Sequence, residues 1–209
     1  MEAPEPRWRR LGPGERREQI IDAAVRVFTA SAYSEVQVAD IAAEAGVTRG
    51  LLHHYFGTKR DLYLTAVRAV CTVPGADEVR TARGPLAHRV AVSVEWLLRT
   101  QEYFGAGWVR LAGQAASGDP EVQQILDEAD RQAAERLLTV VGFAGTEPER
   151  QVALASAVVF GGMARFAGRA WLEQETLDRD QVRALLVGTL TALLADVVPQ
   201  MTAMAERET

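Results

Sequence analysis

Apolar residues recur at intervals of three and four along almost the whole of this 209-residue chain. No window alternates apolar and polar residues as a half-buried strand would. Because side chains three and four positions apart share one face of a helix, this spacing predicts amphipathic helices throughout. The expected fold class is therefore all-α.

Glycine, proline and capping residues divide the chain into expected helices. A first helix should begin near Glu15, followed by helices over 38–44, over 48–55, and from Thr58 past Val70. The stretch "TVPGADEVRTARGP" is the best candidate for a boundary between domains. Beyond it we expect four more helices: Pro85 to about Thr100, Asp119 to near Gly142, Thr146 to about Leu172, and Asp178 to just before Pro199.

The net charge of −5 is unevenly distributed along the chain. Residues 1–70 hold ten Arg and Lys against nine Asp and Glu, whereas residues 71–209 hold thirteen against nineteen. Because salt screens charges beyond about 10 Å, only the local charge matters at a phosphate surface. An acidic body behind a slightly basic head is therefore compatible with DNA binding by the head alone.

Three further features indicate where the protein works. A single cysteine, Cys71, excludes an internal disulfide and fits a reducing cytoplasm. The longest uncharged apolar run, roughly residues 152–164, is shorter than the ~20 residues that a membrane span needs. The N-terminus has basic residues but no apolar stretch behind them, so we expect no secretory signal. We therefore expect a cytoplasmic protein with no membrane partner.

The segment "VADIAAEAGVTRGLLHHYFGTKRDLYL", from Val38 to Leu64, reads as helix, tight turn, helix, stop and helix. A helix-turn-helix buries one side of each helix and leaves the outer side of its second helix free for the major groove. Apolar and small residues are expected on the inner side: Ile41, Ala42, Val47, Leu52 and Phe56.

The outer side of this segment carries residues suited to DNA. Arg49 lies at the start of the second helix, where its forked guanidinium matches guanine O6 and N7. Gly50 removes bulk beside the bases, and Leu51 can contact a thymine methyl group. Phosphate contacts are expected from Gln37, Thr48, Tyr55 and Lys59. A helix pair with a merely solvated outer face has the same spacing, so this alternative stays open.

The residue pattern indicates no metal site, cofactor or enzyme activity. His53 and His54 are adjacent on one helix and point about 100° apart, so they cannot chelate one ion. The stretch "GAGWVR" follows no strand and lacks the third glycine of a dinucleotide fingerprint. No nucleophile–base pair, carboxylate pair or metal cluster is evident.

The longer stretch "VADIAAEAGVTRGLLHHYFGTKRDLYLTAV" resembles the DNA-binding segment of the TetR family of transcriptional regulators. The shared pattern is an "IA..AGV" helix and turn, an aromatic- and His-rich recognition helix, and a lysine soon afterwards. His53 stands where the family often has an aromatic residue, commonly tyrosine. The resemblance implies a helix-turn-helix DNA-binding domain over residues 15–70, preceded by a flexible basic arm over 1–14. The residues that it implies approach DNA are Gln37, Thr48, Arg49, Gly50, Leu51, His53, His54, Tyr55 and Lys59.

The resemblance also implies that residues 71–209 form a helical ligand-binding and dimerisation domain. The sequence supports this independently, because "VALASAVVFGGMARF" is apolar around nearly the whole helix and needs cover on two sides. The last expected helix has an apolar stripe wider than one neighbour would cover. We therefore expect a homodimer, with one large monomeric core as the alternative.

Aromatic residues gather in the middle of this domain beside glycines and a few polar groups, as in a hydrophobic ligand pocket. We expect a small-molecule site bordered by Trp96, Tyr103, Phe104, Trp108, Gln114 and Arg165. The predicted function is a transcriptional regulator, most simply a repressor that leaves a near-palindromic double-stranded DNA operator when a small apolar or amphipathic effector binds. The alternative is a helical small-molecule-binding or protein-interaction module with a vestigial DNA-binding head.

Overall fold

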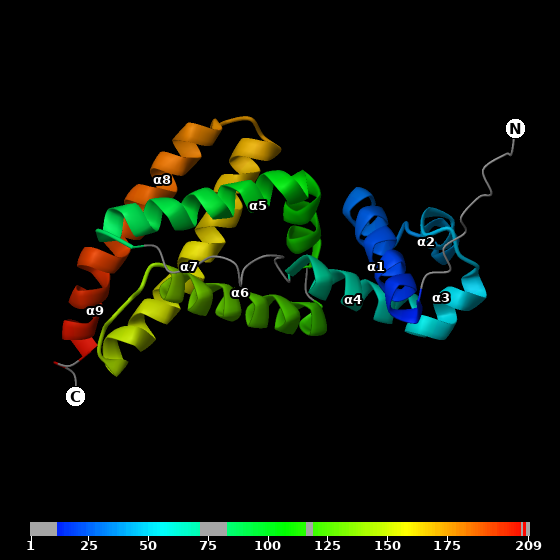
Figure 1. Cartoon of the computed structure of the whole chain (residues 1–209), viewed down its shortest axis with the longest axis horizontal. Helices are drawn as coiled ribbons and strands as arrows, with labels where there is room; N and C mark the ends of the chain where they lie inside the picture. The colour runs from blue at the N-terminus through cyan, green and yellow to red at the C-terminus, as the bar shows by residue number, and fades with distance from the viewer. Residues whose placement is uncertain (1–11, 72–82, 116–118, 206, 208–209) are drawn as a thin grey trace, which may run out of the picture. The chain divides into compact units, whose positions relative to one another are not determined.

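The computed structural model describes residues 12–71, 83–115, 119–205 and 207, without the side chains of residues 103, 104 and 106–115. Over these residues the chain is helical and forms no strand, which confirms the expected all-α class (Figure 1). The helices are α1 (Pro13–Ala30), α2 (Val38–Glu44), α3 (Arg49–Phe56), α4 (Lys59–Cys71), α5 (Leu86–Ala115), α6 (Pro120–Val140), α7 (Glu147–Leu172), α8 (Arg179–Ala192) and α9 (Val198–Ala205).

Contacts within the chain divide it into two compact units, Met1–Val70 and Cys71–Thr209. The first unit contains α1 to α3 and nearly all of α4, and the second contains α5 to α9. Most of the expected arm over 1–14 and most of the expected boundary stretch lie outside the described residues.

The first unit is built around α1, which packs against α2, while α2 packs against α3. The inner stripe of α1 is buried at Ile20 and Phe28, and α4 buries Leu62. Phe28 also packs edge-on against Tyr63: their ring centroids lie 5.0 Å apart at an interplanar angle of 74°. In this way α1 holds the short helix α2, and α2 in turn holds α3.

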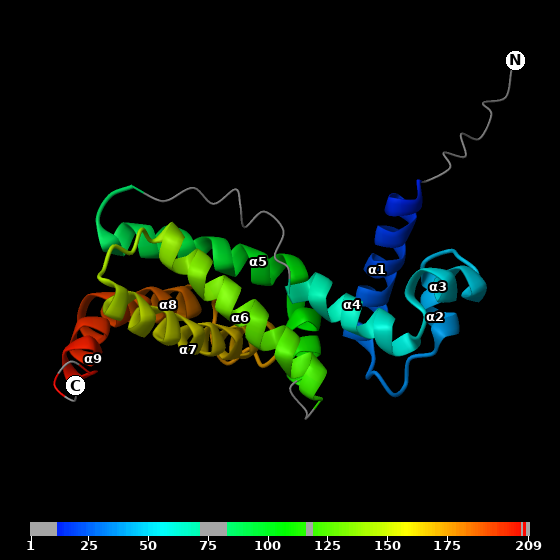
Figure 2. The ribbon, with the colours of Figure 1, turned by 90° about the horizontal axis from the view of Figure 1, so that it is seen from below.

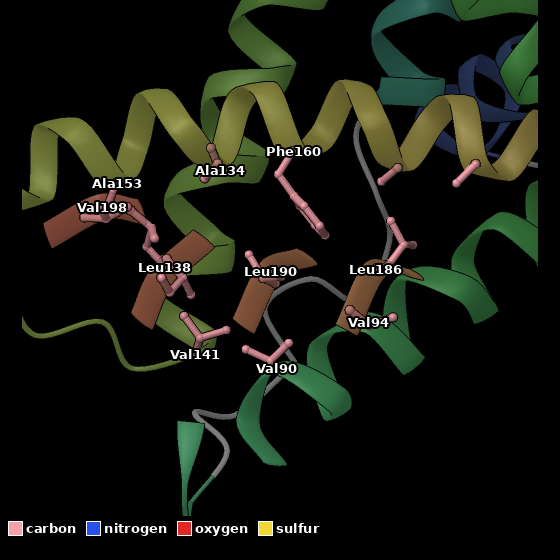
Figure 3. Packing of buried hydrophobic residues seen from close by; sticks show 14 of the residues in the cluster. Val90, Val94, Ala134, Leu138, Val141, Ala153, Phe160, Leu186, Leu190 and Val198 are labelled. Atoms are coloured by element: carbon pink, nitrogen blue, oxygen red, sulfur yellow. The ribbon is translucent and has the colours of Figure 1, made fainter. Parts of the chain in front are cut away.

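The second unit is a helical bundle in which α6 packs against α7 and α5 packs against both α7 and α8 (Figure 2). Buried apolar side chains from all of these helices meet in one core (Figure 3). Its members include Val90, Val94, Leu138, Phe160, Leu186 and Leu190. Thr146 and Asp178 start α7 and α8 as expected, each in a capping box with the residue three positions later, Glu149 and Gln181.

The expected end of α5 near Thr100 is wrong, because the helix continues to Ala115. It does so across a break at Gly105, where φ is 63° and ψ is −170°. This region of backbone space is open essentially only to glycine. Gly105 is visible in the sequence, but the sequence does not indicate whether the helix ends at this glycine or continues beyond it.

The expected end of the last helix before Pro199 is also wrong. A π-helical turn over Leu193–Val197 follows α8, and α9 then carries the chain past Pro199 to Ala205. The Val198 N–H donates to the Leu193 carbonyl five residues earlier. Because the π turn changes the bonding register just before Pro199, the missing proline N–H falls in the first turn of α9, where it is tolerated.

Among the described residues, two helical segments are long and apolar enough to cross a membrane: α7 and the continuous segment Arg179–Ala205. Within their apolar windows only 39% and 28% of the residues are buried inside the chain. Core helices of soluble proteins pass the same test, so the test is weak evidence for a membrane. These low percentages do show that much of the apolar surface of both segments is not buried by other parts of the same chain.

Candidate nucleic-acid interface

The turn between α2 and α3 is closed by backbone hydrogen bonds and one glycine. Gly46 has φ +62°, which L-residues with a side chain rarely adopt, and the Val47 N–H donates to the Ala42 carbonyl at 2.9 Å. Ala42 and Ala45 are buried and small, so the two helices approach closely. Gln19 of α1 donates to the Ala45 carbonyl at 2.9 Å, which ties the turn to its support.

The recognition helix α3 is capped at its start and anchored from behind. The Thr48 hydroxyl accepts a hydrogen bond from the Leu51 N–H at 3.2 Å, as an N-cap residue does. Leu52 is 0% exposed and Phe56 is 7% exposed. The structure therefore holds α3 by the two residues expected on its inner side. Val47, also expected there, is only half-buried.

The predicted DNA-contacting residues lie mostly on the free surface of the first unit. Leu51, Tyr55 and Lys59 are half-buried. The exposed members are Gln37, Thr48, Arg49, Gly50, His53 and His54. A Cβ added at Gly50 would meet nothing within 4 Å, so packing within this chain does not require a glycine there. A partner approaching α3 closely would require one.

Arg49 makes no hydrogen bond or ion pair within the part of the chain that the structure describes. By contrast, Arg26 of α1 bonds to the Glu44 carboxylate at 2.7 Å. An exposed arginine at the start of α3 with no internal partner keeps all five N–H donors for an outside acceptor. Its position and its lack of a partner both suit base recognition.

Lys59 differs from the simple phosphate-contacting lysine that the sequence predicts. Its ammonium group donates to the Tyr33 carbonyl and lies 4.3 Å from the centroid of the Tyr33 ring. The contact joins the start of α4 to the loop after α1. Because an ammonium group has three donors, this anchor still allows a phosphate contact, but it also gives Lys59 a structural role.

Arg17, which the sequence pattern did not single out, lies on α1 with its guanidinium carbon 5.2 Å from the centroid of the Phe56 ring. Arg17 is exposed, and Phe56 is the last residue of α3. The cation–π contact places a second positive charge beside the recognition helix. No local pattern links two residues so far apart in sequence, so only the folded chain shows the pairing.

The expected ligand site is only partly described. The side chains of Tyr103, Phe104, Trp108 and Gln114 lie outside the described residues. Trp96 is half-buried on α5. Arg165 of α7 forms a two-point ion pair with Asp130 of α6, one arm of which measures 2.8 Å. Arg165 is therefore already neutralised by a carboxylate rather than left for an anionic ligand.

Cys71 lies near this ion pair. Burial raises the pKa of the Cys71 thiol to about 11, with a smaller raising effect from the Asp130 charge and a lowering effect from Arg165. The thiol is therefore protonated at neutral pH, which agrees with a buried apolar role rather than a reactive one.

Gln101 of α5 is a second residue that sequence analysis missed. It is 2% exposed, and its amide nitrogen donates to the Ala164 carbonyl of α7 at 3.1 Å. A Cβ on Gly168 would lie 2.7 Å from the Gln101 side-chain oxygen, so only glycine allows this approach. The contact fastens α5 to α7 four residues before the Gly105 break.

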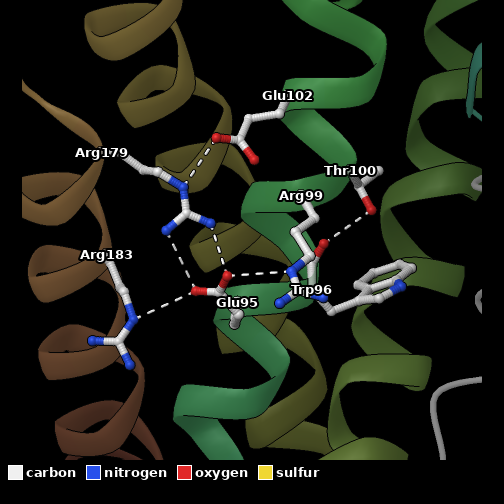
Figure 4. A network of polar contacts seen from close by, with 7 residues as sticks. All are labelled: Glu95, Trp96, Arg99, Thr100, Glu102, Arg179 and Arg183. Atoms are coloured by element: carbon white, nitrogen blue, oxygen red, sulfur yellow. Dashed lines mark hydrogen bonds and ion pairs between the residues drawn. The ribbon is translucent and has the colours of Figure 1, made fainter.

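On its other side, the same part of α5 is fastened to α8 by a charged network (Figure 4). Arg179 bonds to Glu95 at 2.8 Å and to Glu102 at 3.0 Å, and Arg183 lies 3.6 Å from Glu95. The hydrogen bond from Arg179, with a smaller effect from Arg99, holds the pKa of the Glu95 carboxyl below its ordinary value. Within the described residues, no group of three or more metal-ligating side chains occurs.

Comparison with known proteins gives the same picture of the N-terminal unit. Residues 20–66 match the family model described as bacterial regulatory proteins, tetR family. The HTH-type transcriptional regulator BetI of Brucella suis is 34% identical over 117 residues, which are 53% of this chain and 58% of that protein. BetI of Agrobacterium fabrum is 44% identical over 55 residues, covering 26% of this chain and 27% of that one. The match thus spans less than two thirds of these curated relatives.

Solved structures share the fold over nearly the whole chain. A tetR-family transcriptional regulator from Streptomyces coelicolor superposes with a TM-score of 0.71 at 22% identity, covering 93% of this chain and 89% of that one. The fatty acid degradation regulator FadR of Bacillus halodurans superposes with a TM-score of 0.63 at 18% identity, covering 90% and 98%. Residues 20–66 thus match the tetR family of bacterial regulatory proteins, and the chain as a whole shares the fold of a solved structure described as a tetR-family transcriptional regulator.

Proposed function

We propose that this chain is a DNA-binding transcriptional regulator that acts as a homodimer in the cytoplasm. The observation that carries the proposal is the outer face of α3, where exposed Arg49 has no partner among the described residues and Gly50 leaves room for close approach. The forked guanidinium would read guanine in the major groove, and the neighbouring polar residues would hold phosphates.

The proposed contacts divide into two groups. Arg49, Gly50 and Leu51 would face base edges, because they form the first turn of α3. The remaining residues would bind the phosphate backbone or flank it: Gln37, Thr48, His53, His54, Tyr55 and Lys59. Arg17 joins this second group because its contact with Phe56 brings it to the end of the recognition helix.

A second copy of the chain would cover the apolar surface of the C-terminal unit. On α7, Val159 is 75% exposed and Phe166 is 70% exposed. On α8 and beyond, Leu185, Met201 and Met204 are also exposed. The helices α7 and α8 that carry most of these side chains pack against each other, and a large contiguous apolar surface usually marks an interface. A twofold dimer would read two half-sites about 34–36 Å apart, or a multiple of that spacing, so the operator would be nearly palindromic.

The C-terminal unit would also bind a small apolar or amphipathic effector, and the regulator would most simply be a repressor. The proposed border is Trp96, Tyr103, Phe104, Trp108, Gln114 and Arg165, with Arg165 acting through its pair with Asp130. To move operator occupancy from 99:1 to 1:99, the effector must prefer the released state by about 5.5 kcal/mol.

Selection of bound sequences from a random pool of double-stranded DNA tests this function. A regulator enriches a nearly palindromic site and loses affinity steeply as salt rises, because phosphate contacts release counterions. The competing function is a ligand-binding or protein-interaction module with an inactive head. That module would enrich no sequence from the pool.

A further inference from the structure

His53 makes an unusual contact at the end of the recognition helix. Its ring nitrogen Nδ1 lies 2.6 Å from the carbonyl oxygen of Gly57. Gly57 ends α3 with φ +75° and ψ −87°, and the Thr58 N–H donates to the Phe56 carbonyl at 3.0 Å. These values describe a classic γ-turn, a rare and strained conformation. The turn brings the Gly57 carbonyl back towards the helix, where His53 meets it.

This contact determines which ring nitrogen of His53 carries a proton. A carbonyl oxygen can only accept a hydrogen bond, so Nδ1 must be the donor. In the neutral ring, Nε2 is then a bare acceptor, and it becomes an N–H donor only when the ring is protonated. His53 is exposed, and Nε2 has no hydrogen-bond partner among the described residues.

The acidic groups around this turn are already engaged. The Asp61 carboxylate accepts from the Thr58 N–H and hydroxyl, at 3.0 and 2.6 Å. On α2, Asp40 accepts from the backbone N–H of Gln37 at 3.0 Å, and Glu44 pairs with Arg26. The helices of the first unit carry the cations Arg49 on α3, Lys59, Arg60 and Arg68 on α4, and Arg16, Arg17 and Arg26 on α1. The other titratable groups of α3 are His54 and Tyr55, and α1 also carries the carboxylates of Glu15, Glu18 and Asp22. An anion for Nε2 is therefore best supplied from outside the chain.

We propose that His53 binds a DNA phosphate through Nε2 only as an imidazolium, so that each protomer takes up a proton when it binds DNA. This inference rests on the proposed function. A phosphate oxygen, like a carbonyl, only accepts hydrogen bonds, and Nδ1 is held by Gly57. His53 lies in the last turn of α3, away from the first turn that meets the base edges, which favours phosphate over a base as its partner.

The test measures operator affinity by fluorescence anisotropy between about pH 6 and pH 8, at fixed ionic strength, on the sequence selected from the random pool. Wild type should bind more tightly as pH falls, by up to tenfold per pH unit for each protomer that takes up one full proton. His53→Tyr should lose most of this pH response and still bind, because a phenol donates to phosphate in its neutral form. His88→Asn is the matched control: His88 is exposed on α5, and the variant should keep the wild-type response.

Two results would overturn the proposal. An equal pH response in wild type and His53→Tyr would show that another group takes up the proton. If wild type bound DNA more weakly as the pH was lowered and His53→Tyr did not, neutral Nε2 would be accepting a hydrogen bond from a base amine. His53→Phe, which has no hydrogen-bond donor at any pH, tests whether a donor at this position contributes to DNA affinity. It should bind DNA more weakly than His53→Tyr, and its affinity should be equally insensitive to pH. A wild type that selects no DNA sequence at all would instead contradict the proposed function, and this inference with it.

Discussion

At the scale of single residues, the first unit separates side chains that hold the fold from side chains left for a partner. Thr48 caps α3, Lys59 is anchored to Tyr33, and Leu52 is fully buried. Arg49 is exposed and has no partner within the part of the chain that the structure describes. The sequence pattern predicted the buried positions well, because burial follows helical periodicity. It could not predict the anchor on Lys59 or the stacking of Arg17, because both depend on pairs that meet only after folding.

Arg17 gives a prediction at this scale. Arg17→Gln keeps the length of the side chain but removes the charge, so each protomer should lose one phosphate contact. The plot of log affinity against log salt should become shallower by about 0.9 per lost contact, and the preferred DNA sequence should not change. Arg26→Gln is the matched control, because Arg26 lies on the same helix but is paired with Glu44. An unchanged slope in Arg17→Gln would show that Arg17 only packs on Phe56.

At the scale of helices, boundaries marked by caps were predictable and irregular continuations were not. Thr58 with Asp61 and Thr146 with Glu149 form the expected reciprocal caps at the starts of α4 and α7. The continuation of α5 past Gly105 was missed, because a glycine can end a helix or break it locally with equal ease. The continuation past Pro199 needed a π turn, for which sequence spacing gives no signal.

The network between α5 and α8 gives a prediction about pH. Because the folded-state pKa of Glu95 is lowered, its contribution to stability is present above the unfolded value, about 4.5, and is lost as pH falls below it. Wild type should therefore exceed Glu95→Gln in stability at pH 7, by no more than about 1 kcal/mol for so exposed a network. Urea unfolding should show this difference shrinking near pH 3.5. A difference that is equal at both pH values would mean that Glu95 does not contribute as a carboxylate.

At the scale of the whole molecule, the C-terminal unit presents more apolar surface than one chain covers. The sequence predicted this from the breadth of the apolar stripes, and the exposure of Val159 and Phe166 agrees with it. Of the six residues predicted to border the ligand site, four have side chains that lie outside the described residues. Its location remains a prediction.

Phe166 provides the test of the dimer. Phe166→Glu should place a charge in the interface and convert the dimer to a monomer in sedimentation equilibrium, because an unpaired charge is costly to bury. Val92→Glu is the control, since Val92 is an exposed apolar residue on α5, outside the proposed surface. It should sediment as a dimer. A Phe166→Glu chain that also stays dimeric would move the interface elsewhere.

The selection from a random DNA pool, run in parallel on wild type and Arg49→Ala, tests most directly whether the outer face of α3 reads base sequence. Wild type should enrich one nearly palindromic site with half-sites about 34–36 Å, or a multiple of that, apart. Arg49→Ala should still bind DNA at low salt, through its phosphate contacts, but should lose enrichment at the position that Arg49 reads. Enrichment of the same site to the same degree by both proteins, or no enrichment by wild type, would contradict the account.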